Sequence, residues 1–209
     1  MPSPIAKRVA AAVESASWIR EMFERGVRLK AERGADRVFD FSLGNPNAPL
    51  PPAFYDALKT VAGERNDTLH RYMQNAGFPE TRAAIAAYLS KVYPLEFAGN
   101  DLIVTSGAAG ATNVALRAIL EPGDEVIVNA PFFPEYRAYI ENAGGTIKVV
   151  PTDDDYQLDL GAIEAALSPK TRAIIVCSPN NPSGAVYPDS ALAALGKLLS
   201  AQDTDDSPI

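Results

Sequence analysis

The sequence predicts an α/β protein, a three-layer α/β/α sandwich with a mostly parallel sheet. Three observations favour this fold class: apolar runs and amphipathic segments alternate after residue 101, turn residues separate them, and the apolar run 173–177 leads into a proline-rich loop. Strands that alternate with helices pair in parallel through right-handed crossovers, and the helices cover both faces of the sheet. An apolar run without alternation is typical of a strand buried on both faces.

The composition indicates a globular protein with an acidic balance of charge. The chain has 209 residues, of which 47% are hydrophobic, and its net charge is −7 with a pI near 4.8. This hydrophobic content is sufficient for a sizeable core. The negative charge argues against nucleic acid or an anionic membrane as a partner, because both would be repelled.

The sequence also carries two indications of compartment. No apolar stretch is long enough to span a bilayer, and the amino terminus lacks the pattern of a signal peptide. The single cysteine, Cys177, cannot form an internal disulfide and is expected to lie in the buried strand as a small hydrophobic residue. These observations favour a cytoplasmic protein.

The first part of the chain is predicted to be mainly helical. Apolar residues recur at three- and four-residue steps over residues 5–33, and Gly34 ends this pattern. A short apolar segment and a turn-rich loop follow. Prolines then begin a helix that reaches Leu58, since proline is tolerated in a first helical turn. Apolar spacing predicts another helix over residues 81–92.

Strands and helices alternate from residue 101 onward. The expected strands are 102–105, 125–128, 146–150 and 171–177, and the expected helices are 112–120, 134–142, 160–167 and 189–200. Turns rich in proline, glycine, asparagine and aspartate separate them. Parallel strands place their carboxyl ends at one edge of the sheet, which is where open α/β sheets bind ligands.

Three segments at that edge carry residues suited to binding. Residues 106–110 are small and would expose backbone amides at a helix amino terminus, an arrangement that favours a phosphate. Phe133, between two prolines, offers an aromatic face to a planar ring. Asn181 lies in the loop 178–184, where proline and glycine favour a stiff turn that aims one amide side chain.

Each of these features also has an ordinary structural interpretation. A small-residue helix start can pack closely and bind nothing, a phenylalanine is usually a core residue, and an asparagine in a turn often hydrogen-bonds its own backbone. Their joint occurrence is what favours a binding site. His70, the only histidine, has no candidate partner in the sequence and is interpreted as a loop residue rather than a catalyst.

The ordered motifs resemble the first half of a fold-type I, pyridoxal-phosphate-dependent aminotransferase of the aspartate aminotransferase class. The matching stretches are residues 43–46, Tyr72 with Gly77 and Pro79, residues 106–110, residues 131–136 and residues 180–184. The resemblance implies three regions: an arm and helix of a small domain at 1–37, a truncated cofactor-binding large domain at 38–200, and a polar tail at 201–209.

Pyridoxal 5'-phosphate is the cofactor that this resemblance implies. The amides of Ala108 and Ala109 would hold its phosphate, and Phe133 would stack on its pyridine ring. Asn181 would donate a hydrogen bond to its phenolic oxygen. Such a hydrogen bond favours the deprotonated oxygen, and a stacked aromatic side chain fixes the ring while it acts as an electron sink.

The resemblance also implies a homodimer and a pair of substrates. Tyr72 would reach the phosphate bound in the partner subunit, and Gly44 would lie beside the substrate carboxylate. The substrates would be an amino acid and a 2-oxo acid, between which the amino group is transferred. No metal ion is implied.

The sequence departs from the family pattern after the asparagine loop. The family has there an aspartate for the pyridine nitrogen, the Schiff-base lysine and an arginine for the substrate α-carboxylate, and none of these is found in this sequence. Lys148 and Lys170 are predicted at the amino ends of strands, opposite the site. We therefore expect a truncated aminotransferase that is inactive as this chain alone and exposes apolar surface where further strands would pair.

Two alternatives remain open on the sequence. The chain could be a non-catalytic binding or interaction module derived from an aminotransferase, or a fragment of a fold-type I lyase or decarboxylase. The choice of reaction depends largely on residues that this sequence does not contain. The amino-acid substrate is left open for the same reason.

Overall fold

The computed structural model describes residues 4–41, 44, 48–66, 68 and 71–202. The chain divides into two compact units, Met1–His70 and Arg71–Ile209. The division after residue 37 that the resemblance implies stays a prediction. His70 and residues 203–209 of the predicted tail lie outside the described residues. In the described part of the chain, no helix combines the length and the apolar character needed to cross a membrane.

The first unit contains two long helices, as the sequence predicts. They are α1 (Lys7–Arg33) and α2 (Pro52–Gly63), with the short 3-10 helix η1 (Ala35–Arg37) after the first. Gly34 ends α1 with a φ of 92°, which favours glycine, and its N–H donates to the carbonyl of Lys30. Helix α2 continues past the predicted end at Leu58 to Gly63, and the Thr60 hydroxyl donates to the Asp56 carbonyl at 3.0 Å inside it.

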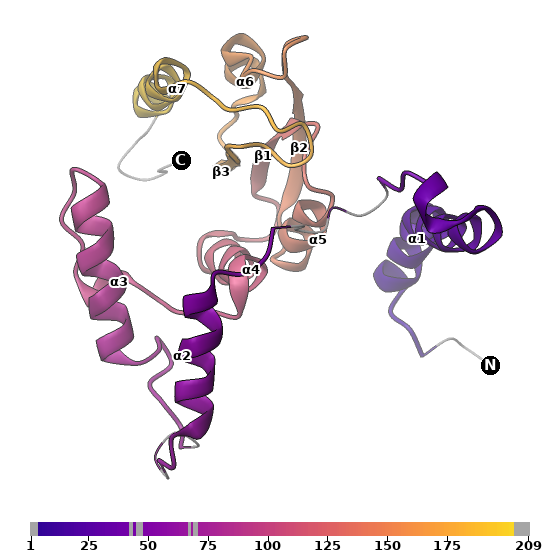
Figure 1. Cartoon of the computed structure of the whole chain (residues 1–209). Helices are drawn as coiled ribbons and strands as arrows, with labels where there is room; N and C mark the ends of the chain where they lie inside the picture. Colours follow the sequence, from indigo (N-terminus) through magenta and orange to yellow (C-terminus); the bar gives the residue numbers. More distant parts are fainter. Residues whose placement is uncertain (1–3, 42–43, 45–47, 67, 69–70, 203–209) are drawn as a thin grey trace. The chain divides into compact units, whose positions relative to one another are not determined.

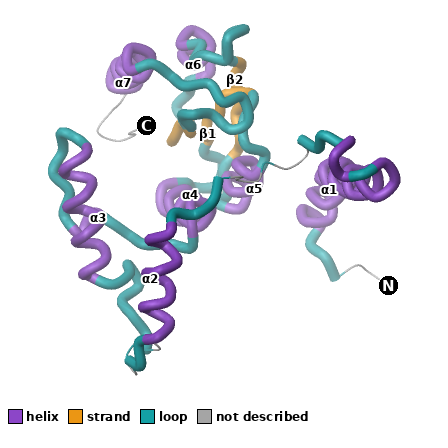
Figure 2. The backbone as a smooth tube through the Cα atoms, viewed as in Figure 1, coloured by secondary structure: helices purple, strands orange, loops and turns teal. Residues whose placement is uncertain are grey.

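The second unit is a three-layer arrangement around a small parallel sheet, and this confirms the predicted fold class (Figures 1 and 2). Its parallel strands have the order β2-β1-β3 and are β1 (Glu125–Ala130), β2 (Thr146–Pro151) and β3 (Thr171–Ile175). Two helices cover each face: α4 (Gly107–Ile119) and α5 (Glu135–Asn142), and on the other face α6 (Leu160–Ala166) and α7 (Asp189–Gln202). Before the sheet, the chain forms α3 (Pro79–Val92) and η2 (Gly99–Asp101).

The core of this unit lies on both sides of β1. Val126 and Val128 face α4 and α5, and Ile127 between them faces α6 and α7. All three side chains are fully buried. Successive side chains of a strand point to opposite faces, so an unbroken apolar run is what a central strand between two helix layers requires.

The strand predicted at residues 102–105 is wrong. The segment is not part of a sheet in the described structure, and the N–H of Val104 donates to the Ala76 carbonyl at 2.9 Å. Ile103 is 63% exposed. The apolar pattern of the segment is that of a strand, but a strand forms only where a neighbouring strand offers a ladder of hydrogen bonds.

The prediction of a fully buried strand at residues 171–177 is also partly wrong. Strand β3 ends at Ile175, and most of its residues are only half-buried. Val176 is exposed, and Cys177 is half-buried in the loop that follows. The reason is that β3 pairs with β1 alone in the described sheet, so its other edge is open.

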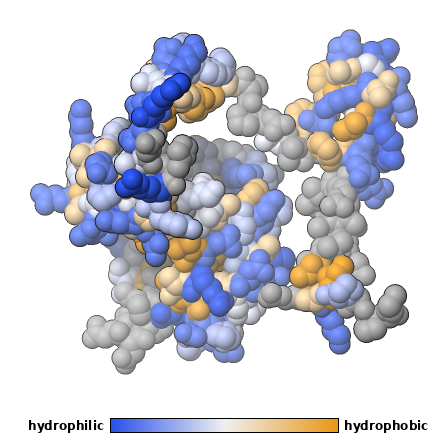
Figure 3. Space-filling model, turned by 90° about the horizontal axis from the view of Figure 1, so that it is seen from below, coloured by the Kyte–Doolittle hydropathy of each residue, from blue (hydrophilic) through white to orange (hydrophobic). Residues whose placement is uncertain are grey.

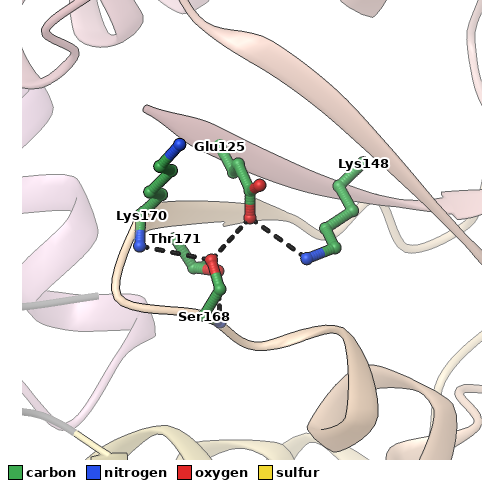
Figure 4. A network of polar contacts seen from close by, with 5 residues as sticks. All are labelled: Glu125, Lys148, Ser168, Lys170 and Thr171. Carbon is green, nitrogen blue, oxygen red and sulfur yellow. Dashed lines mark hydrogen bonds and ion pairs between the residues drawn. The ribbon is translucent and has the colours of Figure 1, made fainter. Parts of the chain in front are cut away.

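A polar network ties the amino ends of the three strands together (Figure 4). The Glu125 carboxylate accepts hydrogen bonds from the Ser168 hydroxyl at 2.6 Å and from the Lys148 ammonium at 3.1 Å. These hydrogen bonds and the positive charges of Lys148 and Lys170 hold the pKa of Glu125 below its ordinary value of 4.5. The two lysines therefore lie at the edge opposite the predicted site, as the sequence predicts.

The lowered pKa of Glu125 makes the free energy of unfolding dependent on pH. Because the folded state favours the charged carboxylate, this stabilisation is present above the unfolded pKa and is lost as the pH falls through the lower folded pKa. Glu125→Gln should cost about 1–2 kcal/mol at pH 7. The difference from wild type should shrink in urea unfolding below about pH 4.5.

The matched control for this substitution is Glu141→Gln. Glu141 pairs with Arg137 at 3.5 Å, but both side chains are more than half exposed. An exposed pair of this kind contributes about 0.5 kcal/mol or less. Equal unfolding free energies for wild type and Glu125→Gln at pH 7 would show that the network does not stabilise the sheet.

Candidate cofactor site

Helix α4 packs on the sheet through its carboxyl-terminal part. Leu116 in its last turns and Leu120 just after it pack against Val126 and Val128 of β1. The chain then turns and enters β1 at Glu125. Helix and strand are each about 20 Å long, so we expect the start of α4 near the end of β1 if the two run in opposite directions, as crossover helices do.

Residues 106–110 form the cap and first turn of α4 rather than a separate loop. The predicted helix start at residue 112 is therefore too late. Gly107 has a φ of 72°, which allows the chain to turn sharply into the helix. The Ser106 side chain makes no capping hydrogen bond. The N–H groups of Ala108 and Ala109 are in the first turn, where no intrahelical acceptor exists, and both residues are exposed.

These features give the start of α4 the properties of an anion cup. Open N–H groups and the positive end of the helix dipole both favour a phosphate. A Cβ atom built on Gly110 would lie 3.4 Å from the Cβ of Thr105, so the small residue lets the helix approach the preceding segment closely. The small residues at 106–110 thus serve both the close packing and the exposure of backbone donors.

The aromatic segment follows the end of β1. Phe133 is half-buried and packs edge-to-face on Tyr136, with ring centroids 5.5 Å apart and an interplanar angle of 82°. Burial and a hydrogen bond with the Cys177 side chain raise the pKa of Tyr136 to about 12, so its hydroxyl stays protonated at neutral pH. Tyr136 therefore contacts the Phe133 ring as a neutral side chain.

The asparagine loop follows β3, and its two asparagines differ in burial. Asn181 is exposed, as a residue that binds a ligand would be. Asn180 is 7% exposed, and its Nδ2 donates to the Pro131 carbonyl at 3.0 Å and to the Ser183 hydroxyl at 2.8 Å. The sequence pattern did not single out Asn180, because two adjacent asparagines carry no signal of which one is buried.

The structure places two of the six predicted binding residues, Phe133 and Asn181, in loops at one edge of the sheet. Ala108 and Ala109 are at the start of α4, Phe133 follows β1, and Asn181 follows β3. Because β1 and β3 are parallel neighbours, the two loops leave the sheet at the same edge. The start of α4, the aromatic ring and the amide side chain match the phosphate, ring and phenolic oxygen of pyridoxal phosphate in chemical type.

No described contact brings Tyr72 or Gly44 to this edge. Tyr72 is fully exposed in the segment before α3. Gly44 belongs to the first unit and is exposed, and a Cβ atom built on it would meet nothing within 4 Å. The roles that the resemblance implies for them stay predictions.

Sequence comparison decides which family these features belong to. The family described as aminotransferase class I and II matches residues 36–204. The chain belongs to the class I and II aminotransferases. Aminotransferases of this family generally use pyridoxal phosphate, and act on amino acids and oxo acids.

Individual aminotransferases resemble the chain in sequence. A probable aspartate aminotransferase of Streptomyces griseus is 36% identical over 196 residues, covering 92% of this chain and 88% of that protein. The aspartate aminotransferase of Streptomyces avermitilis is 35% identical over the same length, covering 92% of this chain and 46% of that protein. The chain spans about half the length of the second relative.

Solved aminotransferase structures match the fold as well. An amino transferase from Eubacterium rectale aligns with a TM-score of 0.92 and 36% identity, over 99% of this chain and 53% of that chain. The Thermus thermophilus aspartate aminotransferase with maleate aligns with a TM-score of 0.80 and 30% identity, over 96% of this chain and 51% of that chain. Both structures therefore extend well beyond the region that this aminotransferase chain covers.

Proposed function

We propose that the chain is the cofactor-binding part of a pyridoxal-phosphate-dependent aminotransferase, which transfers an amino group between an amino acid and a 2-oxo acid. The observation that carries this proposal is that the loops with Phe133 and Asn181 leave the parallel neighbours β1 and β3 at one sheet edge. Bound pyridoxal phosphate would supply the electron sink that amino-group transfer needs.

Each residue at this edge has a defined task in the proposed site. The amides of Ala108 and Ala109 bind the phosphate and so fix one end of the cofactor. Phe133 limits the tilt of the ring by stacking. Asn181 donates a hydrogen bond to the phenolic oxygen and favours its deprotonated form.

The proposed substrates and assembly follow from the relatives. The curated relatives are named as aspartate aminotransferases, and one Thermus structure holds maleate, a dicarboxylate. We propose aspartate as the amino donor to assay first and a homodimer as the working assembly, in which Tyr72 contributes to the partner's site. The chain spans about half the length of the second relative and of the Eubacterium rectale structure, and 88% of the first relative.

Equilibrium titration of the chain with pyridoxal phosphate tests the proposed site. Weak, non-covalent binding is expected. Phe133→Leu should weaken it about fivefold through the lost ring contact. Asn181→Ala should weaken it about tenfold, the loss expected for a hydrogen bond to a charged oxygen. Inorganic phosphate should compete for the cup.

The chain offers a matched control for each substitution. Phe39→Leu makes the same change at a phenylalanine that is 83% exposed in the first unit. Asn142→Ala makes the same change at the exposed end of α5. Binding that is equally weak in wild type, Phe133→Leu and Asn181→Ala would contradict the proposed site.

A further inference from the structure

Two strand-end loops must keep a constant separation for the proposed site to work. One carries Phe133 and the other carries Asn181, and 49 residues separate Pro131 from Asn180 in the chain. A stacked ring and a hydrogen-bonded oxygen belong to one rigid ligand, so a shift of either loop weakens both contacts. A device that joins the loops is therefore to be expected between them.

Asn180 makes a buried hydrogen bond that joins the two loops, in addition to the one between Tyr136 and Cys177. Its Nδ2, in the loop after β3, donates to the Pro131 carbonyl, in the loop after β1, at 3.0 Å. Its backbone N–H donates to the Ala185 carbonyl at 2.8 Å, and its carbonyl accepts from the Gly184 N–H at 2.7 Å. The residue is thus fixed within its own loop at both backbone groups, while its side chain reaches the other loop.

A side chain that follows β2, the other neighbour of β1, also hydrogen-bonds to the end of β1. The Thr152 hydroxyl, just after β2, donates to the Ala130 carbonyl at 2.8 Å. Consecutive carbonyls at the end of β1 therefore accept hydrogen bonds from side chains that follow its two neighbouring strands. Such buried, satisfied hydrogen bonds to backbone groups rigidify a loop more than contacts on an exposed surface do.

We infer that Asn180 is a positioning residue that sets the separation between Phe133 and Asn181 through its hydrogen bond to the Pro131 carbonyl. This inference rests on the proposed function, since the two positioned residues are those assigned to the cofactor. Asn180 itself is buried and is not assigned any contact with the cofactor. Its neighbour Asn181 would bind the ligand, and Asn180 would hold the loop from which Asn181 reaches it.

Cys177 gives a reporter of this connection that needs no cofactor. It is the single cysteine of the chain, it is half-buried at the base of the asparagine loop, and its Sγ donates to the Pro179 carbonyl at 3.3 Å. A loop released from Pro131 opens more often, and its thiol becomes accessible more often. The rate at which a disulfide reagent modifies Cys177 therefore measures the coupling directly.

The test compares four variants of the whole chain. Asn180→Ala removes the side-chain contact, and Asn180→Asp keeps the size, loses the N–H donors and adds a carboxylate charge beside the Pro131 carbonyl. Ser183→Ala removes the second acceptor of Asn180 but leaves the contact with Pro131. Ile163→Val shortens a fully buried side chain of α6 and controls for a general loss of stability.

Both Asn180 variants should raise the rate of Cys177 modification about tenfold, as expected for the loss of one buried hydrogen bond. They should also weaken pyridoxal phosphate binding and reduce the visible circular dichroism of the bound cofactor, which reports a fixed ring orientation. Ser183→Ala and Ile163→Val should stay within about twofold of wild type in all three measurements.

The possible failures are distinguishable. Modification rates for the Asn180 variants equal to those of Ile163→Val would overturn the inference, because the effect would then follow from stability alone. A faster thiol reaction with unchanged cofactor affinity and dichroism would also overturn it, since the loops would be coupled without positioning the ligand contacts. Absence of cofactor binding by wild type would count against the proposed function, and the thiol rates would still decide whether Asn180 couples the loops.

Discussion

Transamination by the 209-residue chain alone is expected to be undetectable. Covalent attachment of pyridoxal phosphate requires an amine aimed at its aldehyde carbon. In the described second unit, Lys148 and Lys170 are held at the opposite edge of the sheet, and the remaining lysines are on α3 and α7. None of these positions follows the carboxyl end of a strand.

The test is reduction with borohydride in the presence of pyridoxal phosphate, followed by mapping of modified lysines by mass spectrometry. Scattered labelling at low occupancy is expected, with no turnover of aspartate or other amino acids. The Thermus thermophilus aspartate/prephenate aminotransferase serves as the positive control. Stoichiometric labelling of one lysine together with turnover would mean that the chain is a complete enzyme.

Self-association of the isolated chain is the second large effect expected. Ile103, Val104 and Val114 line a mostly apolar hollow of about 510 Å³ in the second unit, and each is at least 43% exposed. Further apolar residues lie at the surface among polar ones, as Figure 3 shows in orange. Exposed apolar surface and an open strand edge both favour association between copies.

Sedimentation analysis at tens of micromolar should therefore give an average mass above the 22.3 kDa of one chain. Ile103→Lys should lower that average without lowering the melting temperature, because the side chain is 63% exposed. Ala165→Lys adds the same charge at an exposed position of α6 and should leave the mass unchanged. A wild-type chain that is monomeric at every concentration would contradict this expectation.

The sequence predicted best the elements whose pattern is local. The centre of strand β1, residues 126–128, is an unbroken apolar run, and its burial between two helix layers follows from that pattern. Helices α1, α5, α6 and α7 begin and end close to the expected residues for the same reason. Alternation of strands and helices was sufficient to predict the layers and the parallel pairing.

The parts that the sequence did not predict depend on distant contacts. Residues 102–105 have an apolar pattern but no neighbouring strand in the described sheet. The asparagine pair gave no signal of burial, because the acceptor of Asn180 lies after another strand. Helix α4 begins earlier than expected. The small residues at 107–110 have the pattern of a loop, but they are helical in the structure, where the helix packs on β1.

Mapping the bound cofactor on the protein tests the proposed site most directly. Titration of the isotope-labelled chain with pyridoxal phosphate, followed through assigned backbone amide resonances, reports which segments the ligand contacts. We expect chemical-shift changes at the amides of residues 106–110, 131–136 and 178–184. No change is expected at Glu125, which lies in the network of Figure 4 at the opposite edge of the sheet. Shifts centred on Glu125 and its lysine neighbours, with none at the start of α4, would contradict the proposed site.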